Sequence, residues 1–123
     1  MVKVAAGAGT TLFVNQQFKV TARCFDNGGG DLTARFYLKT RKDNAMFSSE
    51  SGSDTNFDRS DGKIVFGDGE GEASGTAPQL LAYDDYQDVY ALSATGKALI
   101  ARVASGVHVL GAACIFSGLF EHA

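Results

Sequence analysis

Carboxylates and tyrosines alternate near position 85 in a pattern that could support chemistry. Asp84, Tyr86, Asp88 and Tyr90 are spaced two residues apart, so an extended strand places all four on one face. Paired carboxylates beside aromatic rings occur in carbohydrate-binding and glycosidase sites, and a solvated strand face has a similar composition. The pattern predicts an acidic, aromatic face that acts as a protein interface or as a ligand site.

Nucleophilic catalysis has few candidate residues in this chain. A nucleophile needs a general base held close to it, and the chain has two histidines, His108 and His122. His108 lies in an uncharged stretch, and His122 is next to the last residue. A Cys24–His108 couple has no supporting signature. We therefore expect no catalytic residues and a protein that is not an enzyme.

Calcium is the metal that best matches the oxygen-rich middle of the chain. Asp54, Asn56 and Asp58 begin like an EF-hand loop. Arg59 and Val65, however, occupy the two positions where that loop requires glycine and glutamate. The sequence therefore predicts no metal centre and no cofactor, although a loosely held calcium ion that assists a ligand site stays an alternative.

A second candidate surface is basic and depends on a predicted β-hairpin. Residues 17–25 and 32–40 alternate between apolar and polar side chains, and the glycine-rich segment 26–31 between them is typical of a turn. The outward positions of the two strands carry four cations, Lys19, Arg23, Arg35 and Lys39. This face predicts an interface for a structural partner. An acidic pI of about 5.2 argues against nucleic acid.

Two registers keep the apolar residues of this hairpin on one face. Pairing Cys24 with Ala34 sets the like charges opposite one another, whereas pairing Cys24 with Leu32 staggers them. Directly opposed like charges destabilise a sheet, so the pairing of Cys24 with Leu32 is predicted. Each cysteine lies in an apolar strand pattern, which predicts two buried reduced thiols, with a long-range disulfide between Cys24 and Cys114 as the alternative.

The remaining patterns predict an all-β architecture in one domain that covers residues 1–123. Strands are expected near 64–66, 86–92 and 97–103, with acidic, Gly/Ser-rich loops around 48–62 and 67–77. Roughly eight to ten short strands in a chain of this length predict an antiparallel β-sandwich or a jelly-roll-like fold.

Neither end of the chain predicts membrane association. The first residues contain no continuous apolar segment typical of a secretory signal. The apolar stretch 103–120 contains glycines, serines and His108, so two strands that break near Gly111 are expected there rather than a membrane helix. No compartment is predicted from these features, although a place in a virion fits the function expected below.

Charge is segregated along the chain, and this favours assembly. Residues 1–42 carry a net charge of +5, residues 43–88 carry −9, and residues 89–123 carry +1. Complementary patches can fix the register of an assembly. We therefore expect a structural protein that forms a homo-oligomer or decorates a larger array, such as a virion capsid surface. Its partner is itself or another structural protein. The alternative is a β module that binds a carbohydrate or another small ligand.

Overall fold

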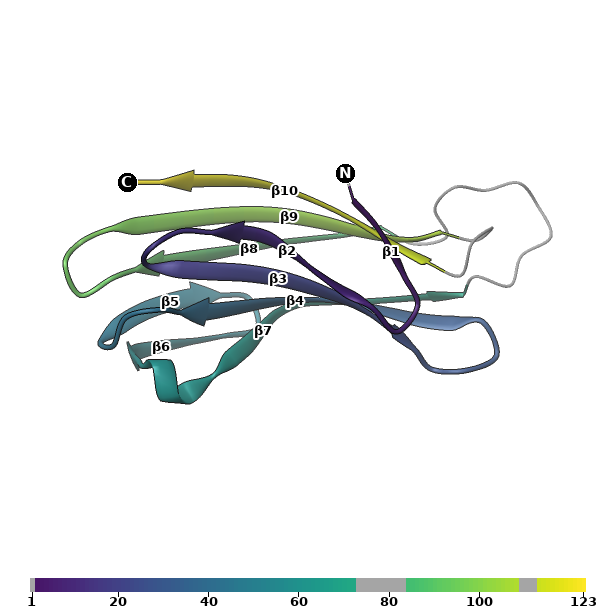
Figure 1. The fold of residues 1–123 in the computed structure, drawn as a ribbon, viewed down its shortest axis with the longest axis horizontal. Helices are drawn as coiled ribbons and strands as arrows, with labels where there is room; N and C mark the ends of the chain where they lie inside the picture. The colour runs from purple at the N-terminus through teal and green to yellow at the C-terminus, as the bar shows by residue number, and fades with distance from the viewer. Residues whose placement is uncertain (1, 73–83, 109–112) are drawn as a thin grey trace.

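The computed structural model describes residues 2–72, 84–108 and 113–123, which form ten strands in two antiparallel sheets. One sheet, called sheet A, contains β1 (Val2–Ala5), β5 (Ala45–Ser49), β6 (Gly52–Phe57), β8 (Asp84–Leu92), β9 (Ala98–His108) and β10 (Ala113–His122). The other, called sheet B, contains β2 (Gly9–Val14), β3 (Phe18–Asp26), β4 (Asp31–Thr40) and β7 (Lys63–Glu72). The predicted single-domain β-sandwich is confirmed (Figure 1).

The order of strands in each sheet determines which strands have free edges. Sheet A has the order β1-β10-β9-β8-β5-β6, and sheet B has the order β2-β3-β4-β7. The chain moves between the sheets after β1, β4, β6 and β7. After β6, the short 3-10 helix η1 (Arg59–Asp61) forms a corner visible at the lower left of Figure 1. Most of the strands run along the long axis of the molecule, whereas β1 crosses it obliquely (Figure 1).

Phenylalanine side chains fill the space between the two sheets. Phe18, Phe36, Phe57, Phe66 and Phe116 are all almost completely buried. The Phe36 ring centroid lies 5.3 Å from that of Phe116 and 5.8 Å from that of Phe66. Because Phe36 belongs to β4 and Phe116 to β10, the contact between these two rings joins sheet B to sheet A.

A disulfide also joins the two sheets, so the prediction of two reduced thiols is wrong. Cys24 on β3 and Cys114 on β10 are bonded, with their Cα atoms 5.6 Å apart and both side chains fully buried. Strand alternation directs each cysteine inward, and the stacking of the sheets brings them together. Cys24 therefore provides no free thiol for a couple with His108.

The hairpin of β3 and β4 is confirmed, but its predicted register is wrong. Cys24 pairs with Ala34, so Arg23 lies opposite Arg35 and Lys19 lies opposite Lys39. This register continues the ladder to the pair of Asp26 with Leu32. The three consecutive glycines at 28–30 all have positive φ, which permits the turn that joins the two strands in this register.

Two segments predicted as acidic loops are largely strands. Residues 48–62 include the end of β5, all of β6 and η1, and residues 67–72 belong to β7; residues 73–77 lie outside the described residues. The strands β6 and β7 are edge strands, where polar and glycine-rich sequences are tolerated. Gly67 is required sterically, because a Cβ atom there would lie 2.9 Å from Cδ2 of Phe36.

The C-terminal part of the chain follows its predicted strand pattern. The strands β8 and β9 form a hairpin whose turn is closed by hydrogen bonds from the Ser93 amide to the Lys97 carbonyl and from the Gly96 amide to the Ser93 carbonyl. β9 and β10 then pair along ten residue pairs, and Gly111 lies outside the described residues. No helix in the described ranges is long and apolar enough to cross a membrane.

Candidate interaction surfaces

Three rows of side chains lie across the outer face of sheet B. The pairing of β3, β4 and β7 aligns Lys19, Lys39 and Lys63 in what we call the lysine row. The pairing of β2, β3 and β4 aligns Thr11, Thr21 and Tyr37 in what we call the hydroxyl row. Arg23 and Arg35 lie opposite each other in the third row, the arginine row. All four cations predicted for a basic interface therefore lie on this face, which also contains Lys63.

Local partners explain why the arginine row tolerates opposed like charges. The Phe25 ring lies near both guanidinium groups, with its centroid 5.4 Å from Cζ of Arg23 and 5.1 Å from Cζ of Arg35. Arg23 also donates a hydrogen bond to the Gly7 carbonyl at 3.1 Å. Arg35 forms an ion pair with Asp68 of β7 at 3.3 Å. A carboxylate from the acidic third of the chain thus offsets part of the basic third within one molecule.

The electrostatics of Arg35 keep its guanidinium charged. Partial desolvation opposes the charge, but attraction to Asp68 and hydrogen bonds that involve Tyr37 and Asp68 outweigh it and raise the pKa of Arg35 above its usual value. Sequence reasoning missed the Arg35–Asp68 pair, because it depends on β7 lying beside β4. The segment that contains Asp68 was predicted as a loop.

The outer face of sheet A carries exposed apolar and aromatic side chains. We call it the aromatic face and define it by Met46, Tyr86, Tyr90, Leu92 and Leu119, all exposed, together with Asp88 and Arg102. Tyr86 and Leu119 are the most exposed, at 75% and 72%. The predicted alternation along β8 is thus confirmed for Tyr86, Asp88 and Tyr90. Asp84 begins β8, opposite Gly106, and its side chain lies outside the described part.

The aromatic face is not flat, because two hollows lie on it. One, of about 450 Å³, lies over Ala104 and Gly118 and is bordered by Tyr86 and Leu119. The other, of about 500 Å³, is lined by residues that include Met46, Tyr90, Leu92 and Ile100. Sequence reasoning singled out the tyrosines but missed Met46 and Leu119, because β5 and β10 contain apolar residues on both faces and give no clear alternation.

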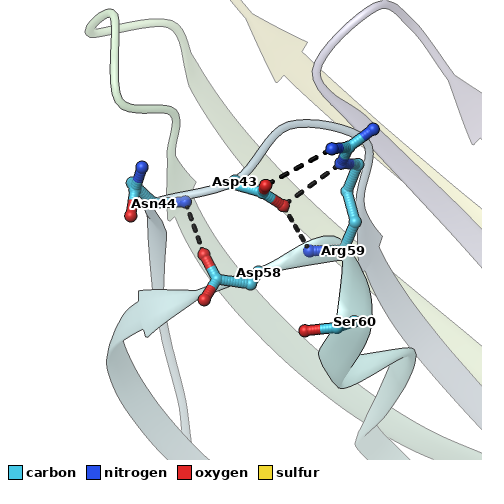
Figure 2. A pocket seen from close by; sticks show the side chains of 5 residues that line it. All are labelled: Asp43, Asn44, Asp58, Arg59 and Ser60. Carbon is cyan, nitrogen blue, oxygen red and sulfur yellow. Dashed lines mark hydrogen bonds and ion pairs between the residues drawn. The ribbon is translucent and has the colours of Figure 1, made fainter.

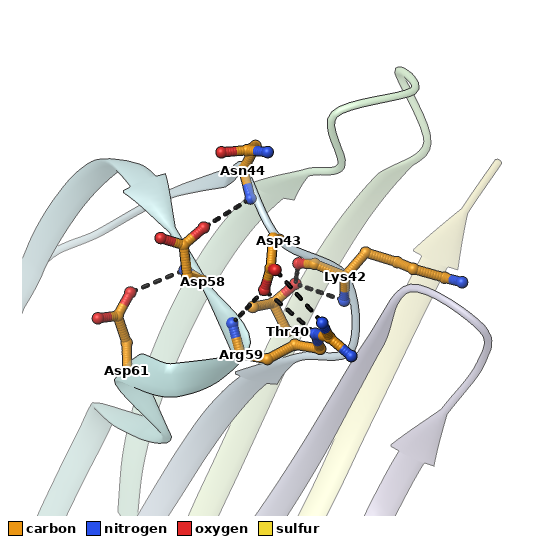
Figure 3. Close-up of polar contacts among 7 residues, drawn as sticks. All are labelled: Thr40, Lys42, Asp43, Asn44, Asp58, Arg59 and Asp61. Carbon is orange, nitrogen blue, oxygen red and sulfur yellow. Dashed lines mark hydrogen bonds and ion pairs between the residues drawn. The ribbon is translucent and has the colours of Figure 1, made fainter.

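A polar hollow of about 560 Å³ lies at the corner formed by η1 and the β4–β5 connection (Figure 2). Arg59 donates to the Asp43 carboxylate from its amide, its Nε and its Nη2, at 3.0, 3.1 and 3.3 Å. The Asn44 amide donates to Asp58 at 2.8 Å, and the Asp58 amide donates to Asp61 at 2.7 Å (Figure 3). The carboxylates are engaged within the protein, so this hollow is a structural junction.

The pH dependence of thermal unfolding should reveal how much the ion pair between Asp43 and Arg59 stabilises the fold. Hydrogen bonds from the Arg59 side chain and amide hold the pKa of Asp43 below its usual range. A carboxylate with a lowered folded-state pKa stabilises the fold above its unfolded-state pKa of about 3.9, and this contribution is lost as the pH falls through the folded-state pKa. We expect Asp43→Asn to lower the melting temperature by at most a few degrees near pH 7, and this difference to shrink as the pH falls below about 4.

Thermal melts of both proteins across this pH range check the expectation. The matched control is Glu50→Gln, which removes an exposed acid in the β5–β6 turn. A difference between wild type and Asp43→Asn that stays constant from pH 7 to about pH 2.5 would contradict the assignment.

The fold does not assemble a site from the other residues that the sequence analysis considered for metal binding or catalysis. Asp54 accepts a hydrogen bond from the Asn56 amide at 2.9 Å within its own strand. His122 is exposed and its ring lies 5.3 Å from that of Phe13, whereas the His108 side chain lies outside the described residues. In the described ranges, no group of three or more His, Cys, Asp or Glu side chains is placed to hold a metal ion.

The described chemistry therefore resides in two opposite faces of the sandwich, one basic and one aromatic. Comparisons with protein-family models, with curated proteins and with solved structures find no match to this chain.

Proposed function

We propose that this protein is a non-enzymatic structural subunit that self-associates by packing the aromatic face of one copy against that of another. The observation that carries the proposal is the exposure of large apolar side chains on a regular sheet surface. Contiguous exposed apolar patches mark interaction sites, whereas isolated exposed hydrophobic residues are ordinary. The aromatic face contains five such side chains on three strands of one sheet, β5, β8 and β10.

The charges on this face favour a second copy as the occupant. Asp88 lies directly opposite Arg102 near the middle of the face, and both are exposed. A two-fold axis beside this pair brings Asp88 of one copy to the partner's Arg102, and Arg102 to the partner's Asp88. An isologous interface requires such self-complementarity. The hollow between Tyr86 and Leu119 provides space for a protruding side chain of the second copy.

The dimensions of the face approach those of a stable dimer interface. The strands β8, β9 and β10 contain 9, 11 and 10 residues, so each is about 30 Å long. Together with β5 they cover a flat area of roughly 600 Å², calculated from strand length and strand spacing without the surface of the protruding side chains. Stable interfaces bury about 800 Å² of accessible surface on each partner, which a corrugated face of this footprint approaches.

A structural role outside the reducing cytosol is consistent with the buried disulfide. Disulfides persist in oxidising surroundings, such as the exterior of cells and the surfaces of virions. A disulfide-linked sandwich that associates through one face can act as a dimer or as a unit of a larger array, such as a capsid surface.

Light scattering after size exclusion tests the proposal directly. We expect the mass of two copies at high protein concentration and dissociation on dilution, with little change between low and high salt, because most of the interface is apolar. A dimer that dissociates at high salt would place the interface on charged surfaces instead. A monomer at every concentration would overturn self-association and favour the binding of a carbohydrate or another small ligand at the hollow beside Tyr90.

A further inference from the structure

We propose that the outer face of sheet B binds a linear polyuronate, a glycan with one carboxylate on each sugar ring, along the lysine row. This inference goes beyond the proposed self-association, because it concerns the opposite face of the sandwich. Two observations support it. Three lysines on adjacent strands form a row, and a groove beside this row is lined in part by residues with hydroxyl groups.

The lysine row has a regular geometry. Lys19 pairs with Lys39, and Lys39 pairs with Lys63, so the three side chains leave the same face of three adjacent strands. Adjacent strands are about 4.8 Å apart, which is close to the length of one sugar ring. Because lysine side chains are long and flexible, carboxylates of a polyuronate that crosses the strands can approach the ammonium groups of neighbouring strands.

The lysines of this row are available for such a ligand. No described carboxylate forms an ion pair with Lys19, Lys39 or Lys63, although Arg35 on the same face is paired with Asp68. Lys39 and Lys63 are exposed, and Lys19 is half-buried. Lys63 is held over the Tyr37 ring, with its Nζ atom 4.4 Å from the ring centroid. Directly opposed like charges destabilise a sheet, so an anion along this row relieves a repulsion present in the free protein.

A groove beside the lysine row provides contacts for the uncharged part of a sugar. It has a volume of about 390 Å³, and its lining includes Thr11, Thr21, Tyr37, Arg23 and Lys63. Gly9 also lines the groove and has no side chain to fill it. Hydroxyl groups can donate and accept hydrogen bonds, which suits the hydroxyl groups of a sugar. The cation–π contact with Phe25 and the hydrogen bond to Gly7 position Arg23 at the end of the groove.

The same features disfavour a nucleic acid. Binding of single-stranded nucleic acid relies on exposed aromatic rings that stack with bases. On this face Tyr37 is only 7% exposed and is covered by Lys63, and Phe25 is flanked by two guanidinium groups. Neither ring is open for stacking, whereas Thr11, Lys39 and Lys63 are exposed.

Calorimetric titration with an oligogalacturonate at low salt tests the proposal. We expect binding by the wild type and binding about tenfold weaker by Lys39→Gln/Lys63→Gln. The matched control is Lys42→Gln/Lys97→Gln, which removes two exposed lysines outside sheet B and should bind like the wild type. Thr21→Val leaves the charge unchanged and should weaken binding by roughly threefold to fivefold through the lost hydroxyl contact.

Two further ligands separate specific recognition from general attraction of anions. The fully methyl-esterified oligogalacturonate has the same backbone without charge and should not bind measurably. A single-stranded thymidine oligonucleotide should bind more weakly than the uronate, and its binding should not respond to Thr21→Val. The proposal is overturned if the uronate does not bind, if both double variants lose affinity equally, or if the oligonucleotide binds as tightly as the uronate.

Discussion

Replacing both cysteines, in Cys24→Ser/Cys114→Ser, is expected to reduce the free energy of unfolding by about 2–5 kcal/mol. The disulfide spans 90 residues of sequence, so it removes a large loop-closure entropy from the unfolded chain. It also joins β3 to β10 at a fully buried position, where two serine hydroxyls would lie among apolar neighbours. Both effects act in the same direction.

Denaturant unfolding at one low protein concentration measures this change without a contribution from self-association. Reductant should move the unfolding midpoint of the wild type towards lower denaturant and leave that of the double variant unchanged. The chain has two cysteines, so a thiol assay of the unfolded wild type without reductant should detect none. Two reactive thiols in that assay, or a midpoint that does not respond to reductant, would contradict the disulfide.

Strand alternation predicted the inward side chains of β3 and β4 because it depends only on neighbouring residues. Cys24 and Ala34 were both assigned to the core, and both are buried. The register between the strands was predicted wrongly, since it was judged from the repulsion of Arg23 and Arg35 alone. Their stabilising partners are the Phe25 ring on β3 and the Asp68 carboxylate on β7, and the carboxylate becomes a neighbour only through the tertiary fold.

The composition of the two faces shows the same limit of sequence reasoning. Tyr86, Asp88 and Tyr90 could be placed on one face because they share one strand. Met46 and Leu119 could not be added, because they come from β5 and β10, on either side of the β8–β9 hairpin. Long-range strand order is not encoded in local periodicity. The extent of the aromatic face over four neighbouring strands therefore became visible only in the structure.

Tyr86→Lys is expected to raise the dissociation constant of the proposed dimer at least about 100-fold, which corresponds to roughly 2.7 kcal/mol. A two-fold interface contains every substituted position twice, so two lysine charges would be placed against apolar surface. Each would have to be desolvated or would hold the faces apart. Tyr86 is 75% exposed in the monomer, so the folded monomer should tolerate the change.

Comparison with a matched variant separates this effect from added charge in general. Val14→Lys also replaces an exposed apolar residue with lysine, but on β2 of sheet B, and it should leave the dimer unchanged. Leu119→Lys, on the other border of the Tyr86 hollow, should weaken association as Tyr86→Lys does. Light scattering over a dilution series compares all three with the wild type. If Val14→Lys dissociates the dimer and Tyr86→Lys does not, the interface lies on sheet B, and the aromatic face is then left free for a small ligand.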